Sequence, residues 1–263
     1  MNTVAQAPFT HALVTGASSG IGESVAHKLG KAGVGMVLVA RRKDRLEAIA
    51  AKYPNVEVLV ADLTTQSGLD AVISRMQSVS LPLIDLVVNN AGFGTSGAFV
   101  DANPQRLSNE ISLNVNALTR ISHEAIRQMQ PRGRGFLLNV SSVASFQPGP
   151  ELAVYAATKA FVTSLTEALH EELRGSGIRV TALCPGLTRT EFQSVSNTSG
   201  LESTFPDFAW MSADDVARDG LRAVADGKAI CVPGLVNKSL ATVSTFTPRG
   251  LARRIAGLAT RLR

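Results

Sequence analysis

Short apolar segments alternate with longer segments of helical periodicity along most of this chain of 263 residues. Several apolar segments lack polar alternation, as expected of strands covered on both faces. We expect strands at residues 12–14, 35–40, 56–60, 84–89, 135–140, 178–183 and 229–232. We expect helices at residues 21–32, 44–52, 68–78, 104–130, 151–174 and 213–225. Alternating strands and helices produce a parallel sheet, so the sequence predicts one doubly wound α/β domain of about seven strands.

Composition restricts the chain to a compact protein with a large core. Hydrophobic residues make up 45% and charged residues 18% of the chain, which argues against disorder. No apolar run approaches the roughly 18 residues that a membrane-spanning helix needs. The first ten residues carry no signal-peptide pattern, so we expect a cytoplasmic protein. Cys184 and Cys231 lie in strand-like runs and are expected to be reduced thiols, and no metal site is predicted.

The positive charge of the chain is concentrated at its C-terminal end. The formal net charge is +5, from 26 Lys and Arg against 21 Asp and Glu. From Gly227 onward there are seven basic residues and no acidic ones, which leaves 19 basic against 21 acidic residues, or −2, in the preceding part. The body of the protein therefore gives no indication of nucleic-acid binding.

A glycine-rich segment lies between the first expected strand and the first expected helix. It reads Thr15-Gly16-Ala17-Ser18-Ser19-Gly20-Ile21-Gly22. Glycines at such a turn let the backbone approach a pyrophosphate at a helix N-terminus. A glycine cluster alone is weak support, but the strand–turn–helix setting is the one that a dinucleotide site requires.

The end of the second strand indicates which dinucleotide is bound. An acidic residue there would bind the ribose hydroxyls of NAD, but this chain has Ala40-Arg41-Arg42-Lys43. Arginine binds phosphate well, so we predict NADP(H), with Arg41 as the main partner of the 2′-phosphate and Ser18 or Arg42 assisting. The alternative is an ordinary solvated basic loop.

Tyr155 and Lys159 lie four residues apart where a helix is expected to begin, so they share one helix face. Lowering the pKa of a phenol from about 10 to about 7 takes roughly 4 kcal/mol. One positive charge at about 5 Å in an effective dielectric of about 20 supplies roughly 3 kcal/mol. The pair is thus a candidate proton donor and acceptor near neutral pH. The alternative is a half-buried ring beside a solvated charge.

The motifs, taken in order, resemble those of the short-chain dehydrogenase/reductase (SDR) family over residues 10–233. The glycine-rich segment is followed by Asp62, by Asn89-Asn90-Ala91-Gly92 after the fourth strand, by Ser142, and by Pro185-Gly186 after the sixth strand. The resemblance implies a Rossmann-type doubly wound parallel sheet of seven strands in a single domain. It also implies an oxidoreductase that uses a nicotinamide cofactor.

The resemblance further implies the residues of the site. The implied catalytic residues are Asn114, Ser142, Tyr155 and Lys159. The implied cofactor-binding residues are Gly16, Ser18, Ser19, Gly20, Ile21, Gly22, Arg41, Arg42, Asp62, Asn89, Ala91, Gly92, Tyr155, Lys159, Pro185, Gly186, Thr188 and Thr190. By this resemblance Asp62 contacts the adenine, residues 89–92 support the sheet and line the adenosine side, and Thr188 and Thr190 hold the nicotinamide carboxamide.

A mechanism follows from the same resemblance. In the reductive direction NADPH delivers hydride to a carbonyl carbon while Tyr155 donates a proton to the developing alkoxide. Ser142 orients the carbonyl oxygen. Lys159 lowers the pKa of Tyr155 and binds the nicotinamide ribose, and Asn114 holds a water that links Lys159 to solvent. We expect an NADP(H)-dependent oxidoreductase that interconverts a carbonyl compound and its alcohol.

Residues 187–211 resemble the family's substrate lid and carry several large apolar side chains: Phe192, Phe205, Phe208, Trp210 and Met211. An apolar lid favours a small hydrophobic ketone or aldehyde, unless these side chains only pack the lid onto the body. Two alternatives stay open: a β-ketoacyl thioester reductase of a lipid or polyketide pathway, and an NADPH-binding regulatory or membrane-associated protein on the same fold.

The chain divides into a lead at residues 1–10, the domain at residues 11–233 and a C-terminal extension at residues 234–263. In the extension, Leu251, Ile255, Leu258 and Leu262 form one apolar stripe, with arginines elsewhere. Such a basic amphipathic helix either lies on an anionic membrane or, as we favour here, packs on the body or on a partner subunit.

The family resemblance also implies a homodimer or homotetramer. The expected helices at residues 104–130 and 151–174 are those that the family pairs across a two-fold axis. The second helix carries apolar positions that we interpret as additional to those its own core needs: Val162, Leu165, Leu169 and Leu173.

Overall fold

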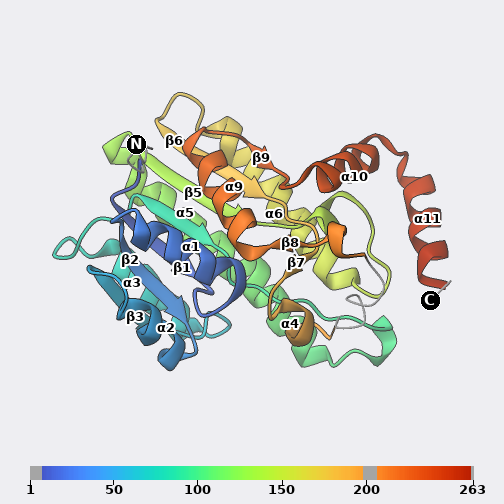
Figure 1. Ribbon diagram of the computed structural model, residues 1–263, viewed down its shortest axis with the longest axis horizontal. Helices are drawn as coiled ribbons and strands as arrows, with labels where there is room; N and C mark the ends of the chain where they lie inside the picture. The colour runs from blue at the N-terminus through green and yellow to red at the C-terminus, as the bar shows by residue number, and fades with distance from the viewer. Residues whose placement is uncertain (1–7, 198–205, 262–263) are drawn as a thin grey trace.

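The computed structural model describes residues 8–197 and 206–261, and these form one parallel sheet with helices on both faces (Figure 1). The sheet has seven strands in the order β3-β2-β1-β4-β5-β6-β9, and every neighbouring pair is parallel. The strands are β1 (His11–Thr15), β2 (Gly35–Ala40), β3 (Val56–Val60), β4 (Leu86–Asn89), β5 (Gly135–Val140), β6 (Ile178–Leu183) and β9 (Ile230–Cys231). This order confirms the predicted Rossmann-type sheet.

The helices follow the strands in the predicted alternation. They are α1 (Gly20–Lys31), α2 (Lys43–Ala50), α3 (Gln66–Gln77), α4 (Pro104–Ile111), α5 (Leu118–Met129), α6 (Ala153–Glu172), α7 (Phe192–Val195), α9 (Ala213–Ala225), α10 (Leu235–Phe246) and α11 (Arg249–Arg261). Short 3₁₀ turns lie at η1 (Phe99–Asp101), η3 (Gln130–Arg132), η4 (Val143–Phe146) and η5 (Asp207–Ala209). No helix among the described residues is long and apolar enough to cross a membrane.

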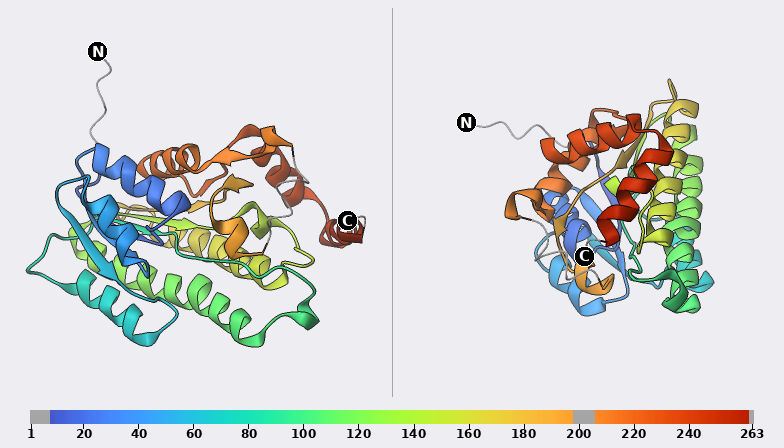
Figure 2. Two further views of the ribbon diagram at one scale, coloured as in Figure 1. Left: turned by 60° about the horizontal axis from the view of Figure 1, so that its bottom comes forward. Right: turned by 90° about the vertical axis from the view of Figure 1, so that its right-hand side faces the viewer.

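Helices cover both faces of the sheet (Figure 2), and a hydrophobic layer lies between the helices and each face. On one face, α1, α2 and α9 pack on the strands through buried side chains such as Leu29, Leu46 and Val216. On the other face, α3, α5 and α6 pack in the same way, for example through Val72 and Ile121. Covered faces explain why an inner strand such as β2 is continuously apolar, whereas the edge strand β3 is only partly buried and contains Glu57.

The strand order reverses between β1 and β4, which are neighbours in the sheet although two strands separate them in sequence. Chains leaving the carboxyl ends of these two strands diverge to opposite sides and leave a crevice, which is where ligands bind in open α/β sheets. A separate pair of short strands, β7 (Thr188–Arg189) and β8 (Met211–Ser212), lies within the predicted lid.

Two parts of the chain differ from the sequence expectation. The helix expected at residues 104–130 is α4 followed by a π-helical turn, η2 (Ser112–Ala117), and then α5. The segment after Pro233 forms α10, which the sequence did not predict, before the predicted terminal helix α11.

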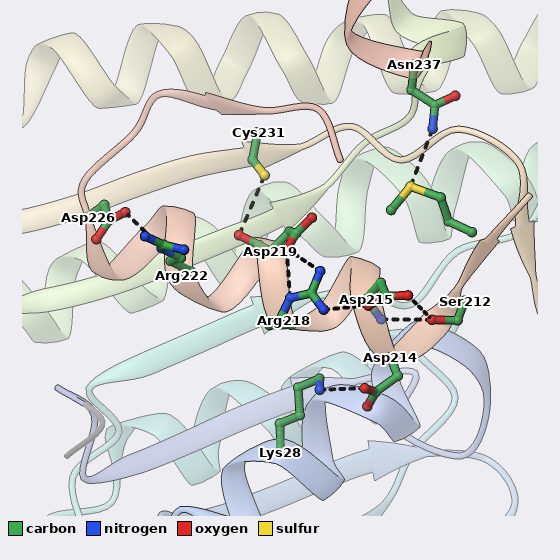
Figure 3. A network of polar contacts seen from close by, with 11 residues as sticks. Lys28, Ser212, Asp214, Asp215, Arg218, Asp219, Arg222, Asp226, Cys231 and Asn237 are labelled. Atoms are coloured by element: carbon green, nitrogen blue, oxygen red, sulfur yellow. Dashed lines mark hydrogen bonds and ion pairs between the residues drawn. The ribbon is translucent and has the colours of Figure 1, made fainter. Parts of the chain in front are cut away.

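Polar contacts fix α9 and the start of α10 to the body (Figure 3). Ser212 caps α9 by accepting a hydrogen bond from the Asp215 N–H at 3.0 Å. The ammonium of Lys28, on α1, lies 2.8 Å from the Asp214 carboxylate. A side-chain cap and an ion pair at the same helix start set the orientation of α9 against α1.

Candidate active site

The glycine-rich turn between β1 and α1 forms an open cradle. Gly16 and Gly20 have φ of +65° and +57°, a left-handed conformation that favours glycine. Ser19 precedes α1 and makes no capping hydrogen bond through its side chain. Since the first N–H groups of a helix have no intrahelical partner, the start of α1 offers donors and a positive dipole end to an anion.

The loop after β4 is fastened to this cradle. Asn90 donates through Nδ2 to the carbonyl oxygens of Thr15 at 2.9 Å and Gly16 at 3.2 Å. The Thr15 hydroxyl accepts hydrogen bonds from the backbone N–H groups of Asn90 and Ala91, both at 3.0 Å. A Cβ on Gly22 would overlap the Gly16 carbonyl oxygen and lie 2.5 Å from Asn90 Nδ2. The glycine at position 22 is therefore needed for the loops to meet.

The side chain of Asn89, at the end of β4, contacts the protein interior and not the cradle. Its buried Nδ2 donates to Ser122 Oγ and to Asn139 Oδ1, both at 3.0 Å. Asn139 in turn donates to Thr166 Oγ1 at 3.0 Å. The residue that the sequence assigned to the cofactor thus cross-links β4, β5, α5 and α6 inside the protein.

The basic cluster after β2 divides into two separate contacts. Arg42 donates to Ser18 Oγ at 3.2 Å from Nε and pairs with the Glu191 carboxylate at 2.8 Å. The Arg41 side chain is 74% exposed, and its Nη1 lies 3.9 Å from Asp62 Oδ2. Arg42 and Ser18 therefore form the firmer pair beside the cradle. Glu191 at the start of the lid was not a sequence-predicted site residue.

Asp62 is held as a carboxylate by its own loop. Burial favours the protonated form, but hydrogen bonds from the Thr64 N–H and hydroxyl, at 2.9 and 2.7 Å, together with the Arg41 charge, outweigh it. The net effect is a pKa below the usual aspartate value. Asp62 is thus an acceptor at neutral pH.

The π-helical turn places Asn114 over the loop that follows β4. Asn114 Nδ2 donates to the Phe93 carbonyl at 2.8 Å and to Thr158 Oγ1 at 3.1 Å. A Cβ on Gly92 would lie 2.9 Å from Asn114 Oδ1 and 3.5 Å from Lys159 Nζ. Asn114 and Lys159 therefore approach the same stretch of backbone. π-helical turns frequently occur at functional sites.

Tyr155, Ser142 and Lys159 come together at the carboxyl edge of β5, and all three side chains are largely buried. Lys159 Nζ donates to the Val140 carbonyl at 2.8 Å and lies 5.8 Å from the centre of the Tyr155 ring. Ser142 Oγ accepts a hydrogen bond from the Ala144 N–H at 3.1 Å, which fixes the turn η4. The three predicted side chains thus share one buried corner.

The electrostatics of this corner differ from the sequence expectation. The pKa of Tyr155 is raised to about 12, mainly by burial. The hydrogen bond with Ser142 lowers this pKa, and the negative charge of Glu110 raises it further. Burial also lowers the pKa of Lys159 to about 8. We expected Lys159 to bring the pKa of Tyr155 toward neutrality. Among the protein's own groups that expectation is wrong, because desolvation dominates both residues.

Glu110 is a buried carboxyl group that the sequence analysis missed. Its side chain is fully buried. Burial raises its pKa, and hydrogen bonding by Thr95 together with the positive charges of Arg106 and Lys159 opposes that shift. Glu110 lies four residues before Asn114 and so shares its helix face. That spacing was the available signal.

The lid lies over Tyr155. Phe192, on α7, packs on the Tyr155 ring with centroids 5.3 Å apart and planes inclined by 51°. Trp210 is buried, with the Arg189 guanidinium 5.6 Å from its ring centre. Of the other predicted lid residues, Phe205 lies outside the described residues, and the side chain of Phe208 is not described. Phe192 thus gives the site an apolar wall.

The loop after β6 joins the lid to the glycine cradle. The Pro185 carbonyl accepts a hydrogen bond from the Val143 N–H at 3.0 Å, and the Thr188 hydroxyl donates to the Gly186 carbonyl at 3.0 Å. A Cβ on Gly20 would lie 3.0 Å from Thr190 Cγ2. The loop after β6 therefore lies directly beside the glycine-rich turn after β1.

The corner has no features of a metal or thiol site. No group of three or more His, Cys, Asp or Glu in the described part of the chain could hold a metal ion. Cys184 and Cys231 are free thiols, and burial raises the pKa of each to about 11. Neither thiol is a ready nucleophile at neutral pH.

Known proteins share this fold and sequence pattern. A family model described as short chain dehydrogenase matches residues 10–199. A short-chain dehydrogenase from Sphingobium yanoikuyae, solved in complex with NADPH, is 33% identical with a TM-score of 0.79, over 91% of this chain and 97% of that one. A bulky-bulky ketone specific alcohol dehydrogenase from Comamonas testosteroni is 31% identical with a TM-score of 0.76, over 91% and 95%.

A third solved structure is a 3-ketoacyl-(acyl-carrier-protein) reductase from Brucella melitensis in complex with NADH. It is 27% identical with a TM-score of 0.75, over 86% of this chain and 96% of that one. The family model covers well over half of the chain, and the parallel seven-stranded sheet agrees with the solved structures of that family. The chain therefore belongs to the short-chain dehydrogenase family of oxidoreductases.

Proposed function

We propose that this protein is an NADP(H)-dependent oxidoreductase that interconverts a hydrophobic ketone or aldehyde with its alcohol. The observation that carries the proposal is the meeting of Tyr155, Ser142 and Lys159 in one buried corner, under the apolar ring of Phe192 and next to the glycine cradle. A proton donor, a hydrogen-bonding hydroxyl and an apolar wall are what a carbonyl substrate requires.

The residues present fit a dinucleotide. The left-handed glycines at positions 16 and 20 and the uncapped start of α1 suit a pyrophosphate, and a side chain at Gly22 would close the cradle. Ser18 and Arg42 suit a 2′-phosphate beside it. A bound NADPH would supply the hydride.

The chain's own groups manage the proton. With a pKa raised to about 12, Tyr155 keeps its proton at neutral pH and can donate it to a carbonyl oxygen. Ser142 Oγ, at the edge of the same corner, orients that oxygen by hydrogen bonding. Lys159 Nζ donates to the Val140 carbonyl, and Asn114 bonds the Phe93 carbonyl nearby. These two residues provide the route by which the phenol is reprotonated.

The preference for NADP(H) rests on the basic cluster and on the NADPH complex of a similar protein. We propose Arg42, assisted by Ser18, in place of Arg41 as the main 2′-phosphate partner, because Arg42 bonds Ser18 in the glycine-rich turn whereas Arg41 lies against Asp62. We expect Arg42→Ala to weaken NADPH binding by about tenfold or more while changing NADH binding little, because a charged hydrogen bond is worth about 1.5–3 kcal/mol. Lys43→Ala is the matched control, since Lys43 pairs with Glu47 on α2.

The substrate class rests on the lid. Phe192 packs directly on Tyr155, and a similar protein acts on bulky ketones. A β-ketoacyl thioester is the second candidate, since another similar protein is a ketoacyl reductase. A regulatory protein that binds NADPH without turnover is the third, and the intact set of Ser142, Tyr155 and Lys159 argues against it.

The test is NADPH consumption with apolar ketones, aldehydes and β-ketoacyl thioesters. Tyr155→Phe is expected to reduce turnover by a factor of about 10² or more while NADPH still binds. Tyr53→Phe is the matched control, because the chain has two tyrosines and Tyr53 bonds His27 instead. Turnover on thioesters alone would select the second candidate. Unchanged turnover in Tyr155→Phe would refute the assignment.

We also propose that the chain forms a homodimer or homotetramer through α4, η2 and α6. Ile111 and Phe161 are 43% and 41% exposed there. Between these helices lies an apolar hollow of about 360 Å³, lined by Ile111, Val115, Ala153, Val154, Ala157 and Thr158. Val162 and Leu173, which we had interpreted as free for a partner, are buried in the chain's own core, because they face the sheet. Phe161→Glu should lower the mass measured by sedimentation velocity.

A further inference from the structure

The helix α10 presents an apolar face to solvent. Leu235, Val243 and Phe246 are 84%, 64% and 83% exposed. At 100° per residue, these three side chains lie within one sector of the helix, and the buried Asn237 and Ala241 lie in the opposite one. The exposed apolar face is therefore directed away from the body. The exposed Ser239 lies in the same sector, and a group of three large exposed apolar side chains on one side of a helix is uncommon unless something covers it.

The helix is well fixed on the body beside the candidate site. Asn237 donates to the Pro233 carbonyl at 3.1 Å, and its Nδ2 lies 3.5 Å from Met211 Sδ (Figure 3). The Asn237 side chain also fills the space that a Cβ on Gly186 would occupy. Further along α10, Ser244 donates to Gln147 at 3.2 Å. The apolar face is thus held rigidly next to the loops after β5 and β6, which surround Tyr155.

The charge of the same segment is of one sign. From Gly227 to the last residue there are seven basic and no acidic residues, whereas the preceding 226 residues sum to −2. Lys238 on α10 and Arg253 and Arg254 on α11 are exposed. The two helices lie together at the end of the molecule where the chain ends (Figure 1; Figure 2, right). A basic surface beside an apolar face complements an anionic, apolar surface.

We propose that α10 and α11 dock this protein on an anionic lipid bilayer. Leu235, Val243 and Phe246 enter the boundary between headgroups and acyl chains, and the exposed Lys and Arg side chains contact the headgroups. A second copy of the chain is a poorer occupant, because two such segments would bring only positive charges together. The bound protein presents the loops around Tyr155 to the bilayer, from which an apolar substrate can enter directly.

Vesicle co-sedimentation tests the proposal and needs neither cofactor nor turnover, so its outcome is independent of the proposed activity. The probes are vesicles of phosphatidylcholine alone and vesicles containing phosphatidylglycerol. We expect the whole protein to sediment with the anionic vesicles, and much less with the neutral ones. The double variant Leu235→Ser with Phe246→Ser should lose binding by about tenfold or more, since it removes the two most exposed apolar anchors of the face.

Two further variants make the test specific. Arg253→Gln with Arg254→Gln should weaken binding to anionic vesicles by about tenfold, because each basic residue contributes to the attraction. Val79→Ser is the matched control, because Val79 is 92% exposed but lies before β4, at the amino ends of the strands. The Val79→Ser variant should bind vesicles like the wild type. Circular dichroism of every variant excludes misfolding as the cause.

Three outcomes would overturn the proposal. The first is the absence of sedimentation of the wild type with anionic vesicles. The second is equal binding of the wild type and the Leu235/Phe246 variant. The third is a lower mass of that variant in sedimentation velocity without any vesicle binding, which would show that the face is a contact between copies of the chain.

Discussion

Gly22→Ala is a sharp test of the cradle at the start of α1. Gly22 lies inside the helix, where alanine would by itself be favoured over glycine by about 0.5–1 kcal/mol. The added Cβ, however, would overlap the Gly16 carbonyl oxygen and lie 2.5 Å from Asn90 Nδ2. A comfortable separation is about 3.5 Å, so the two loops must move apart by about 1 Å.

The magnitude follows from these opposing effects. Overpacking of a tight contact costs about 1–3 kcal/mol, which leaves a net destabilisation of about 1–2 kcal/mol after the helical gain. For a domain of this size that corresponds to a melting temperature lower by about 2–8 °C. The larger effect should be on NADPH binding, because the loop that moves carries the N–H groups that we propose as donors to the pyrophosphate. Loss of one charged hydrogen bond, about 1.5–3 kcal/mol, weakens binding by about tenfold or more.

Fluorescence titration with NADPH and a thermal melt measure the two effects. Gly250→Ala on α11 is the matched control, because a Cβ there meets nothing within 4 Å. It should leave NADPH binding unchanged and the melting temperature equal or slightly higher. If Gly22→Ala binds NADPH as tightly as the wild type, the cradle does not hold the pyrophosphate and the reasoning is refuted.

Three further variants test separate parts of the structure. Burial raises the pKa of Glu110 above its ordinary value of 4.5, so the folded protein binds this proton more tightly than the unfolded chain. The stability contributed by this proton is lost as the pH rises from 4.5 through the raised pKa of the folded state. In urea unfolding, Glu110→Gln should therefore be more stable than the wild type above that raised pKa but not below pH 4.5; a pH-independent difference would contradict this. Glu191→Gln should release Arg42 from its 2.8 Å ion pair and tighten NADPH by a few-fold relative to NADH; an equal change for both cofactors would argue against a 2′-phosphate site there. Thr65→Ala removes the hydroxyl that caps α3 and should cost about 1 kcal/mol of stability, with turnover unchanged; a drop in turnover would mean that the cap affects the site.

The sheet and most of the site could be predicted because their signals are local. The strands β2, β3, β5 and β6 begin and end where the sequence predicts, and β2 is a continuous apolar run because both of its faces are covered. The glycine turn, the loop at Asn90 and the Tyr155–Lys159 pair each follow from short segments whose backbone geometry determines the residue types. Parallel strands then bring these segments to one edge.

The order of the two arginines could not be predicted in the same way. Arg41 and Arg42 follow the last residue of β2, and successive side chains of an extended segment point to opposite sides. Either residue could face Ser18, and the choice depends on where the strand ends. The structure directs Arg42 to Ser18 and to Glu191, a residue 149 positions later in the chain. A contact across that separation has no local signal.

The helix α10 escaped prediction for a related reason. An amphipathic helix is recognised when one face is apolar and the other polar. On α10 the buried face carries Asn237, whose amide is needed to bond the Pro233 carbonyl, while the exposed face carries Leu235, Val243 and Phe246. The apolar side of α10 is therefore the side exposed to solvent. A reader who takes apolar periodicity as a sign of the core would assign the exposed side of this helix to the interior. The same inversion is the reason to expect a surface other than this chain's own core to cover these residues.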